Sequence, residues 1–418
     1  MPIVERMVEE HAVALASAVV TRRALAGAPH PTLVQIERID ERIAAHLDGL
    51  ALAGDAGRRV LAGVVDAARH EWGFTAMSLL ASGDVDETRA REAAAGCVTP
   101  EARTGGVDGA GWALKVGGLS DSLVRGVARV DAPMALSMAV RVRPELVDEA
   151  LVESRSVSLD ALLASELLRA ALAAGGRERA LRVVETFEAS DDRAIAVDAC
   201  RARVLATGLR HDASALAELS GLQWTGPAGP LAVAMQAVEV EEGHRLLGRM
   251  FDREQGSPAV IRAIGAFGDP RYIPWLLART RDPAIARVVG ESFAFIVGVD
   301  LAGLDLERRP PDDFESGPTD DPDDPGVETD PDDGLPWPDP DKVDAWWRAN
   351  SHRFPAGRRF FMGRPPAVDH CVKVLAEGRQ RQRIAAAHWR CLLAPGTPLF
   401  PTDAPAWRQR RRLAQEAR

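Results

Sequence analysis

The chain of 418 residues contains nine histidines and four cysteines, and few of them lie at a spacing that could support chemistry. The best metal candidate joins two segments, with His370 directly before Cys371 and His388 three residues before Cys391. Side chains three residues apart on a helix share a face, so His388 and Cys391 could bind one zinc ion together. Adjacent side chains point roughly 100° apart, which is poor geometry for the first pair. We therefore expect buried thiols and hydrogen-bonded histidines here, and no metal site.

Two other histidines have a carboxylate close by in sequence and could serve acid–base chemistry. His46 and Asp48 are two residues apart, and on a helix such side chains diverge by about 200°. His70 and Glu71 begin the pattern of a zinc-protease helix, but Phe74 stands where the second histidine ligand is required. The sequence therefore predicts no catalytic residue and no cofactor. Convergence of His46, His70 and an acid in one cleft would reverse that prediction.

Two stretches resemble ligand-binding loops only in part. Residues 105–111 are rich in glycine like a phosphate-binding loop, but no predicted strand precedes them and no Lys-Ser/Thr pair follows. We expect an irregular loop at 98–110 with no role in binding phosphate. Residues 330–334 lack the alternating oxygen ligands and the closing Glu of a calcium loop. A solvated acidic segment is expected there instead.

Aromatic and basic residues concentrate in the last fifth of the chain, which holds five of the nine tryptophans. Trp and Arg dominate the hot spots of protein interfaces, and aromatic stacking combined with cations also binds nucleic acid. The alternative is that most of these tryptophans bury the last apolar face of a helical body. The predicted partner-binding residues are Trp346, Trp347, Arg358, Arg359, Trp407, Arg408, Arg410, Arg411 and Arg412.

The net charge of −10 is distributed very unevenly. Residues 305–341 hold 15 acids against 2 arginines, whereas residues 342–418 hold 16 basic residues against 5 acids. The chain is therefore predicted to have a mildly acidic body (1–304), an acidic linker rich in Asp and Pro (305–341) and a basic C-terminal module (342–418). The linker cannot bury a core and is expected to be disordered. Its charge would allow it to fold back onto the basic module.

The elements that must position these residues are predicted to be helices. Ala and Leu dominate the apolar residues, and apolar side chains recur at helical spacing between breaks of Gly, Asp and Pro. The clearest unit covers 268–297, where Gly268 closes one helix, Asp269 caps the next and Pro270 suits its first turn. Breaks recur irregularly, roughly every 25 to 40 residues, as in degenerate HEAT-like repeats. We predict an all-α protein, an α-solenoid of such helical hairpins, with essentially no sheet.

Several segments of the chain carry a family resemblance: residues 9–11, 40–50, 268–297, 346–350 and 357–360, with Gly363 and Arg383. Together they resemble a proteobacterial family of uncharacterised HEAT-like repeat proteins. The genes of that family often lie near type VI secretion clusters, so the resemblance implies an accessory or adaptor role, and it brings no catalytic residues.

The function predicted from these features is a non-enzymatic scaffold or adaptor that binds a protein, such as a type VI effector or spike component. The alternative is a helical-repeat protein that binds nucleic acid through its basic module. The N-terminus lacks a basic segment followed by an apolar run, and no apolar stretch approaches the roughly 18 residues of a membrane span. We therefore expect a cytoplasmic protein with reduced thiols and no membrane partner.

Overall fold

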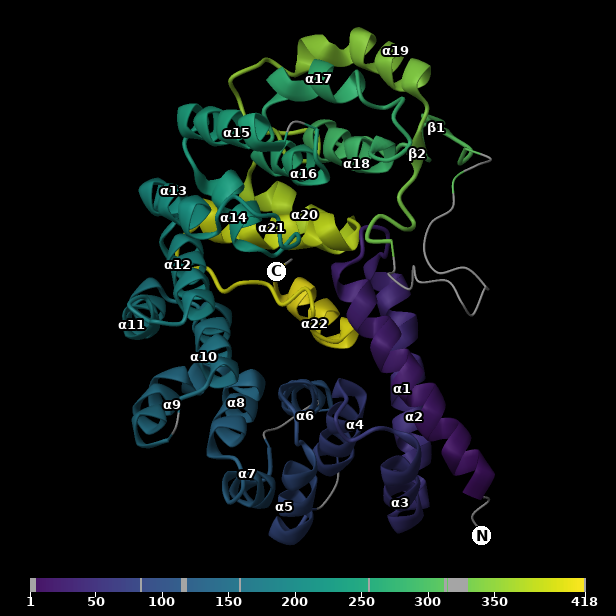
Figure 1. Ribbon diagram of the computed structural model, residues 1–418, viewed down its shortest axis with the longest axis vertical. Coiled ribbons are helices and arrows are strands. Elements are labelled where there is room, and N and C mark those ends of the chain that lie inside the picture. The colour runs from purple at the N-terminus through teal and green to yellow at the C-terminus, as the bar shows by residue number, and fades with distance from the viewer. Residues whose placement is uncertain are drawn as a thin grey trace. The chain divides into compact units, whose positions relative to one another are not determined.

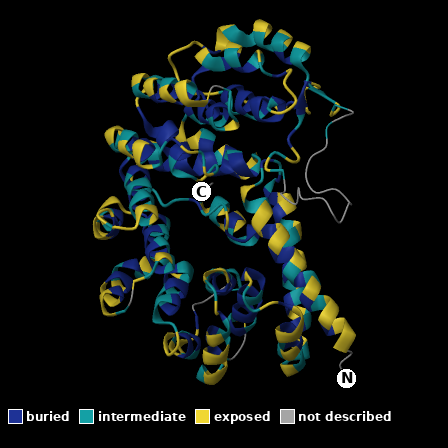
Figure 2. Ribbon diagram, in the orientation of Figure 1, coloured by how far each residue is buried: buried dark blue, intermediate teal, exposed yellow. Residues whose placement is uncertain are grey.

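The computed structural model describes residues 5–82, 85–113, 119–157, 159–254, 256–311, 314 and 330–416. Within these residues the chain forms 22 α-helices and one sheet of two very short strands (Figure 1). Buried residues lie mainly on the sides of helices that face neighbouring helices, and exposed residues on the outer sides (Figure 2). The predicted all-α class is confirmed for these residues, which are mostly helical with almost no strand. None of the described helices combines the length and the apolar run needed to cross a bilayer.

Contacts within the chain divide it into two compact units. Unit 1 comprises Met1–Ala26, Leu33–Ala202 and Gly396–Arg418, and unit 2 comprises Gly27–Thr32 and Arg203–Pro395. The basic C-terminal segment therefore contributes to both units. The three segments defined by composition follow other boundaries and remain a prediction.

Unit 1 is built mainly from helices that follow one another in the sequence, joined by one helix from the C-terminus. Helices two apart in the sequence pack most extensively, such as α4 with α6 and α5 with α7, and α22 packs on α2. Helix α12 (Arg193–Thr207) contains the division between the units. The helices of unit 1 are α1 (Glu5–Gly27), α2 (Leu33–Ala53), α3 (Asp55–Val64), α4 (His70–Ala81), α5 (Glu87–Gly96), α6 (Pro100–Ala113), α7 (Asp121–Ala128), α8 (Ala132–Val142), α9 (Val147–Glu153), α10 (Ala161–Ala174), α11 (Arg177–Phe187) and α22 (Ala406–Glu416), with the 3-10 turns η1 (Pro144–Leu146) and η2 (Ser154–Ser156).

The expected loop at 98–110 is wrong, because helix α6 runs through it. Its glycines are packing residues. A Cβ on Gly105 would overlap the backbone of His70 in α4, and Gly109 makes a similar approach to the same helix. From the other side, Gly73 of α4 lies equally close to α6. Small residues at both faces let two helix backbones approach closely, so glycine here promotes contact between helices and does not interrupt one.

A buried ion pair ties the C-terminal segment of unit 1 to the first two helices. Arg22 of α1 donates to the Asp40 carboxylate of α2 over 2.7 Å, and both side chains are at most 10% exposed. The other Asp40 oxygen accepts the backbone N–H of Ala406 at the start of α22. Arg22 also donates to the carbonyl oxygen of Ala404. Loss of either partner would leave a buried charge uncompensated, so this pair fixes the position of α22.

Unit 2 contains helices that supply the walls of the candidate site. Helix α16 contacts α14, α15 and α18, and α21 contacts α14 and α20. The elements of unit 2 are α13 (Arg210–Leu219), α14 (Pro230–Ala237), α15 (Val240–Glu254), α16 (Pro258–Phe267), η3 (Pro270–Tyr272), α17 (Ile273–Leu277), α18 (Ala286–Val297), β1 (Glu307–Arg308), β2 (Trp337–Pro338), α19 (Pro340–Asn350), η4 (Ser351–Arg353), α20 (Val368–Glu377) and α21 (Gln380–Leu393).

The predicted break at 268–270 is confirmed in detail. Gly268 ends α16 with φ of 80°, a left-handed conformation that favours glycine. The Asp269 side chain accepts the N–H of Arg271 and so caps the turn that begins at Pro270. The same carboxylate also accepts the N–H of Gly357, 88 residues further along the chain. The cap therefore fixes a distant loop as well as the start of its own helix.

The predicted acidic linker is partly outside the described residues, which omit 312, 313 and 315–329. Its two ends are structured, so the expectation of disorder is wrong for 305–311 and 330–341. Strand β1 pairs antiparallel with β2, which brings the two ends of the segment together. Trp337 of β2 is 6% exposed and packs edge-on against Phe314 at 4.6 Å between ring centroids. Burial of these rings and ion pairs described below hold the ends in place.

Candidate functional site

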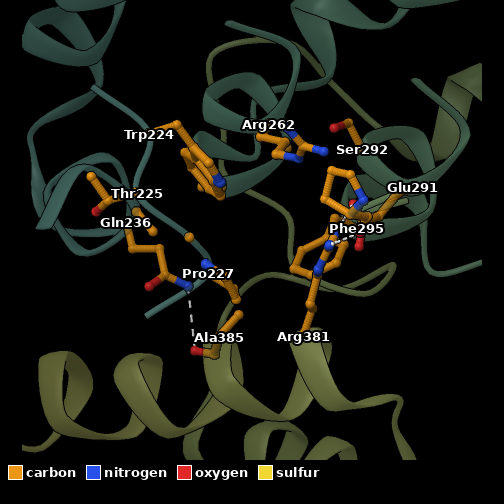
Figure 3. Close-up of a pocket in the computed structure, with 15 residues that line it drawn as sticks. Trp224, Thr225, Pro227, Gln236, Arg262, Glu291, Ser292, Phe295, Arg381 and Ala385 are labelled. Carbon is orange, nitrogen blue, oxygen red and sulfur yellow. Dashed lines mark hydrogen bonds and ion pairs between the residues drawn. The ribbon is translucent and has the colours of Figure 1, made fainter. Parts of the chain in front are cut away.

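The candidate site is a cavity of about 280 Å³ within unit 2 (Figure 3). Helices α14, α16, α18 and α21 line it, together with the loop before α14. Its apolar surface comes mainly from Trp224, Pro227, Phe295 and Pro331, none of which is fully buried. Pockets for drug-sized ligands measure roughly 300 to 1,000 Å³, so this cavity suits a small group or an inserted side chain.

Close packing of α16 against α18 shapes one wall of the cavity. Ser257 caps α16 by accepting the N–H of Val260, and Pro258 fits the first turn. A Cβ on Gly265 would lie 3.0 Å from Ser292, so glycine allows the two helices to approach. Ser292 then donates its hydroxyl to the carbonyl oxygen of Ile261 over 2.9 Å. These contacts make the wall rigid before any ligand arrives.

A buried glutamine joins two further walls. Gln236 of α14 is 3% exposed and donates its amide to the carbonyl oxygen of Ala385 in α21 over 3.3 Å. Its side-chain oxygen lies 3.1 Å from Nδ1 of His388, also on α21. Both ends of the amide therefore have protein partners, and Gln236 positions the helices without needing a ligand.

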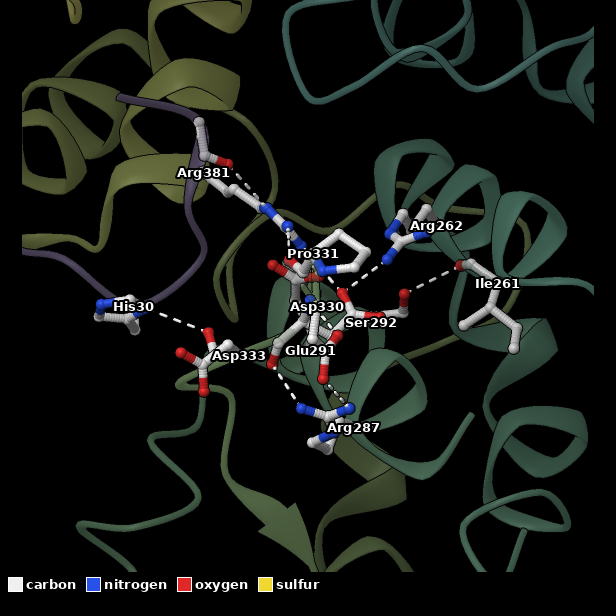
Figure 4. Close-up of polar contacts among 12 residues, drawn as sticks. His30, Ile261, Arg262, Arg287, Glu291, Ser292, Asp330, Pro331, Asp333 and Arg381 are labelled. Atoms are coloured by element: carbon white, nitrogen blue, oxygen red, sulfur yellow. Dashed lines mark hydrogen bonds and ion pairs between the residues drawn. The ribbon is translucent and has the colours of Figure 1, made fainter. Parts of the chain in front are cut away.

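Ion pairs close the opposite side of the cavity, where residues 330–333 meet three helices (Figure 4). Arg262 of α16 binds the Asp332 carboxylate over 2.6 Å, and Arg287 of α18 binds Asp330 over 2.6 Å. All four side chains are at most 15% exposed. Arg287 also donates to the carbonyl oxygen of Asp332. The acidic turn is therefore fixed to the helical body by paired charges.

Arg381 of α21 links this turn to α18. It binds Glu291 over 2.9 Å, and these side chains are only 10% and 9% exposed. It also contacts Asp332 over 3.5 Å and donates to the carbonyl oxygen of Pro331 over 2.5 Å. A further bond reaches the carbonyl oxygen of Gly27. One guanidinium thus holds three separate segments of unit 2.

The charges of this cluster balance, since three arginines meet three carboxylates. Burial raises the pKa of Glu291 above its usual value, and Asp332 acts in the same direction, while Arg381 opposes both. A carboxyl with a raised pKa in a cavity is a candidate general acid. Here the Glu291 carboxylate already accepts a hydrogen bond from Arg381. Glu291 is therefore explained as a member of the structural cluster of ion pairs. The arrangement is suited to binding an apolar group more than to acid–base chemistry.

The nine predicted partner-binding residues divide between the two units, four in unit 2 and five in unit 1. In unit 2, Trp346 and Trp347 are half-buried and pack edge-on against Phe293. Arg359 stacks over Phe267 and donates to the carbonyl groups at the end of α14. Burial lowers the pKa of Arg359 to about 10. Arg358 remains exposed.

In unit 1, the predicted basic residues near the C-terminus make contacts within the protein. Arg410 forms two hydrogen bonds of 2.8 and 2.5 Å with Glu37. Arg408 donates to the carbonyl oxygen of Gly111, and both Arg408 and Arg411 lie over the ring of Trp407. The remaining predicted residue, Arg412, lies 3.9 Å from Glu416.

The predicted metal candidates are occupied by other contacts. His370 pairs through Nε2 with the carbonyl oxygen of Phe361, while His388 pairs with Gln236. Cys371 and Cys391 are buried and form no disulfide, and burial raises the pKa of the Cys371 thiol to about 12. Across the described ranges, no three His, Cys, Asp or Glu residues group as metal ligands would.

Of the two acid–base candidates, only His70 meets an acid in a cavity. His46 lies 3.0 Å from His11 through their Nδ1 atoms, and Asp48 is exposed. His70 pairs through Nε2 with Asp108 over 2.9 Å, and its Nδ1 is buried with no partner in the described part of the chain. The Asp108 carboxylate can only accept, so Nε2 of His70 carries the proton of this hydrogen bond. With Nε2 bonded to Asp108 and Nδ1 buried, the pair has no evident catalytic role.

Comparison with known proteins identifies no relative: the chain matches no protein-family description, no curated protein and no solved structure. The site is therefore interpreted from its own geometry.

Sequence reasoning missed the residues that form the cavity. Trp224 offers a usable signal, because it directly precedes Thr-Gly-Pro, residues that favour a turn, and a large aromatic residue is difficult to bury beside a turn. Arg262, Glu291 and Arg381 lie on three helices up to 119 residues apart in sequence. Nothing in their local sequence indicates that they meet.

Proposed function

We propose that this protein is a non-enzymatic scaffold or adaptor that binds a protein partner in the cytoplasm. In this proposal its helices form an α-solenoid of degenerate HEAT-like hairpins, and the partner inserts a large apolar side chain into the cavity of unit 2. The observation that carries the proposal is a preformed cavity with partly exposed aromatic and proline walls, whose polar side chains are already paired within the protein.

The pairing of the polar groups indicates the chemistry of the occupant. Gln236, Glu291 and Arg381 have protein partners, so an incoming charged group would have to displace existing bonds. An apolar side chain needs no such exchange and would bury the exposed parts of Trp224 and Phe295. Desolvated aromatic pockets of this kind commonly hold the hot spots of protein interfaces.

The resemblance noted in the sequence suggests the kind of partner. If the chain is related to HEAT-like proteins encoded near type VI secretion genes, the partner would be an effector or a spike component. This assignment rests on the resemblance alone, and the test below addresses it directly.

The experiment is affinity capture from the native host with the full chain as bait, followed by titration calorimetry with the purified partner. Trp224→Ala should weaken binding about 30-fold or more, the effect expected for a hot-spot aromatic residue. Ala266→Leu, which fills the cavity from α16, should have a similar effect. Leu304→Ala is the control, because Leu304 is 52% exposed in unit 2 and does not line the cavity.

Two outcomes would contradict the proposal. One is a partner that binds both cavity variants as tightly as the original chain. The other is binding to DNA, with an affinity that falls steeply with salt and is lost on charge reversal at Arg408 and Arg410. The second result would establish the nucleic-acid alternative.

A further inference from the structure

Unit 1 contains a second cavity, of about 240 Å³, whose charged lining residues are mostly arginines. They come from four helices: Arg22 and Arg23 from α1, Arg141 from α8, Arg169 from α10 and Arg408 from α22. Segments far apart in the sequence therefore bring guanidinium groups to one place. None of these arginines has a part in the function proposed for unit 2.

Two of the arginines have their charge balanced by carboxylates. Arg22 pairs with Asp40, as described above. Arg141 lies between Asp108 and Glu166, binding both, and is only 14% exposed. Burial opposes the charge of Asp108, but Arg141 and His70 hold the pKa of its carboxyl well below the usual range. In this half of the lining, each arginine charge therefore has a carboxylate partner.

The other half of the lining has an excess of positive charge. Arg23, Arg169 and Arg408 line the cavity there with one carboxylate, Asp403. Arg169 binds Asp403 over 3.0 Å, and these side chains are 29% and 52% exposed. Arg23 is exposed and has no hydrogen-bond or ion-pair partner among the described residues. Burial, with the neighbouring charges of Arg169 and Arg411, lowers the pKa of Arg408. An anion placed here would relieve the repulsion between these groups.

The wall beside the arginines is aromatic. Phe74 of α4 and Trp112 of α6 line the same cavity, with ring centroids 5.9 Å apart and an interplanar angle of 60°. An anion that carries a ring or a short carbon skeleton could therefore place its apolar part against these rings and its charge against the arginines. The volume restricts it to a small molecule.

We infer that this cavity binds a small organic phosphate monoester, with Arg23, Arg169 and Arg408 around the phosphate and Phe74 and Trp112 beside the organic group. A phosphate presents several acceptor oxygens in different directions and suits donors from three separate helices. A carboxylate presents two oxygens in one plane and suits a single guanidinium fork. The arrangement thus favours phosphate.

The test is titration calorimetry of the full chain with phenyl phosphate, inorganic phosphate and benzoate at one fixed salt concentration. Phenyl phosphate should bind most tightly, inorganic phosphate more weakly because it lacks the ring, and benzoate most weakly. Arg169→Gln and Arg23→Gln should each weaken phenyl phosphate binding about tenfold or more, since each removes a charge-assisted hydrogen bond. Arg38→Gln is the matched control, because Arg38 is an exposed arginine of α2 outside the cavity lining.

Several results would overturn the inference. One is the absence of any heat of binding between the original chain and phenyl phosphate. Another is binding of phenyl phosphate by the two cavity variants as tightly as by the original chain. Equal loss in Arg38→Gln would indicate non-specific attraction to surface charge. Benzoate binding as tightly as phenyl phosphate would show that the site does not select phosphate. A circular dichroism spectrum of each variant establishes that a loss of binding does not reflect loss of helices.

Discussion

The two cavities have similar volumes and both contain arginines, but they differ in how the arginine charges are balanced. In unit 2, Arg262, Arg287 and Arg381 meet three carboxylates, and the cavity beside them is walled by aromatic and proline residues. In unit 1, the five arginines that line the cavity meet four carboxylates, and Arg23 pairs with none of them. The number of arginines alone therefore does not indicate what a cavity binds. The carboxylates that already neutralise them decide whether an apolar group or an anion is favoured.

The ion pairs of the two cavities should also differ in their effect on stability, because the free-energy cost of breaking an ion pair depends on its burial. The Arg381–Glu291 pair is about 10% exposed, whereas the Arg169–Asp403 pair is partly open to solvent. Breaking a buried pair leaves a desolvated charge, and breaking an exposed pair leaves a charge in water. Arg381 of unit 2 should therefore be structural, and Arg169 of unit 1 should be available for binding.

The largest effect is expected for Arg381→Leu, which should destabilise unit 2 by about 3 to 5 kcal/mol. The substitution leaves Glu291 and Asp332 without one of their cationic partners in a buried cluster. Cys371 reports on unit 2, because it is fully buried with a pKa near 12 and should resist alkylation until the unit opens. We expect faster alkylation of Cys371 in the variant, measured by mass spectrometry during pulses of iodoacetamide.

Cys97 provides the internal control for that experiment. It is 6% exposed in unit 1, and burial raises its pKa to about 12. Arg169→Leu should change the protection of neither thiol by more than the equivalent of about 1 kcal/mol. If Arg381→Leu left Cys371 as protected as before, the buried cluster of arginines and carboxylates would not stabilise unit 2.

The next largest effect is expected for Gly105→Ala in unit 1. The added Cβ would overlap the backbone of His70, which cannot move without separating α4 from α6. We expect a loss of about 1 to 3 kcal/mol, seen as faster alkylation of Cys97. Gly63→Ala is the matched control, since a Cβ there meets nothing within 4 Å and alanine favours the helix. Equal stability of the two variants would show that α4 and α6 do not pack through their glycines.

These glycines also show where sequence reasoning succeeds and fails. The break at Gly268–Pro270 was predicted correctly because caps depend on neighbouring residues, and a left-handed glycine followed by Asp and Pro is a local signal. Gly105 and Gly109 were interpreted as a loop because the same residue type also serves close helix packing. Close packing through Gly105 and Gly109 depends on the position of α4. No local sequence pattern identifies α4 as the helix that packs against α6.

The contacts of charged residues are equally difficult to predict from the local sequence. Asp330 and Asp332 lie in a segment predicted to be solvated because its composition cannot form a core, but arginines 43 to 70 residues away in sequence neutralise them. Arg359 was predicted to bind a partner, yet it donates to carbonyl groups that α14 leaves unpaired at its end. Composition predicts the helical class and the excess of charge. It cannot predict which charges meet.

Opposite pH dependences are expected for the two units. Arg141 and His70 hold the pKa of Asp108 below its usual value of 3.8 despite burial, so its contribution is present above that pH and is lost as the pH falls. Burial raises the pKa of Glu291 above its usual value of 4.5, so its contribution is present below that pH and is lost as the pH rises through the raised pKa.

Asp108→Asn should therefore flatten the acid-side loss of stability in unit 1, and Glu291→Gln should flatten the loss in unit 2 above pH 4.5. The measurement is thiol protection of Cys97 and Cys371 in urea across a pH series. A change of the same sign in both units would show that the carboxyls do not titrate as their surroundings require.

The smallest effect is expected for the surface pair between Arg410 and Glu37. Its two hydrogen bonds have good geometry, but the side chains are 46% and 30% exposed, so the pair should contribute only about 0.2 to 1 kcal/mol. A double-mutant cycle with Arg410→Gln and Glu37→Gln, read from Cys97 protection, isolates this coupling. A coupling of several kcal/mol would mean that the pair is desolvated. In unit 1, the exposure of an arginine would then not indicate how much its ion pair contributes to stability. A small coupling would leave Arg410 free to exchange Glu37 for a partner at little cost, which keeps the basic C-terminal helix available as a second contact surface.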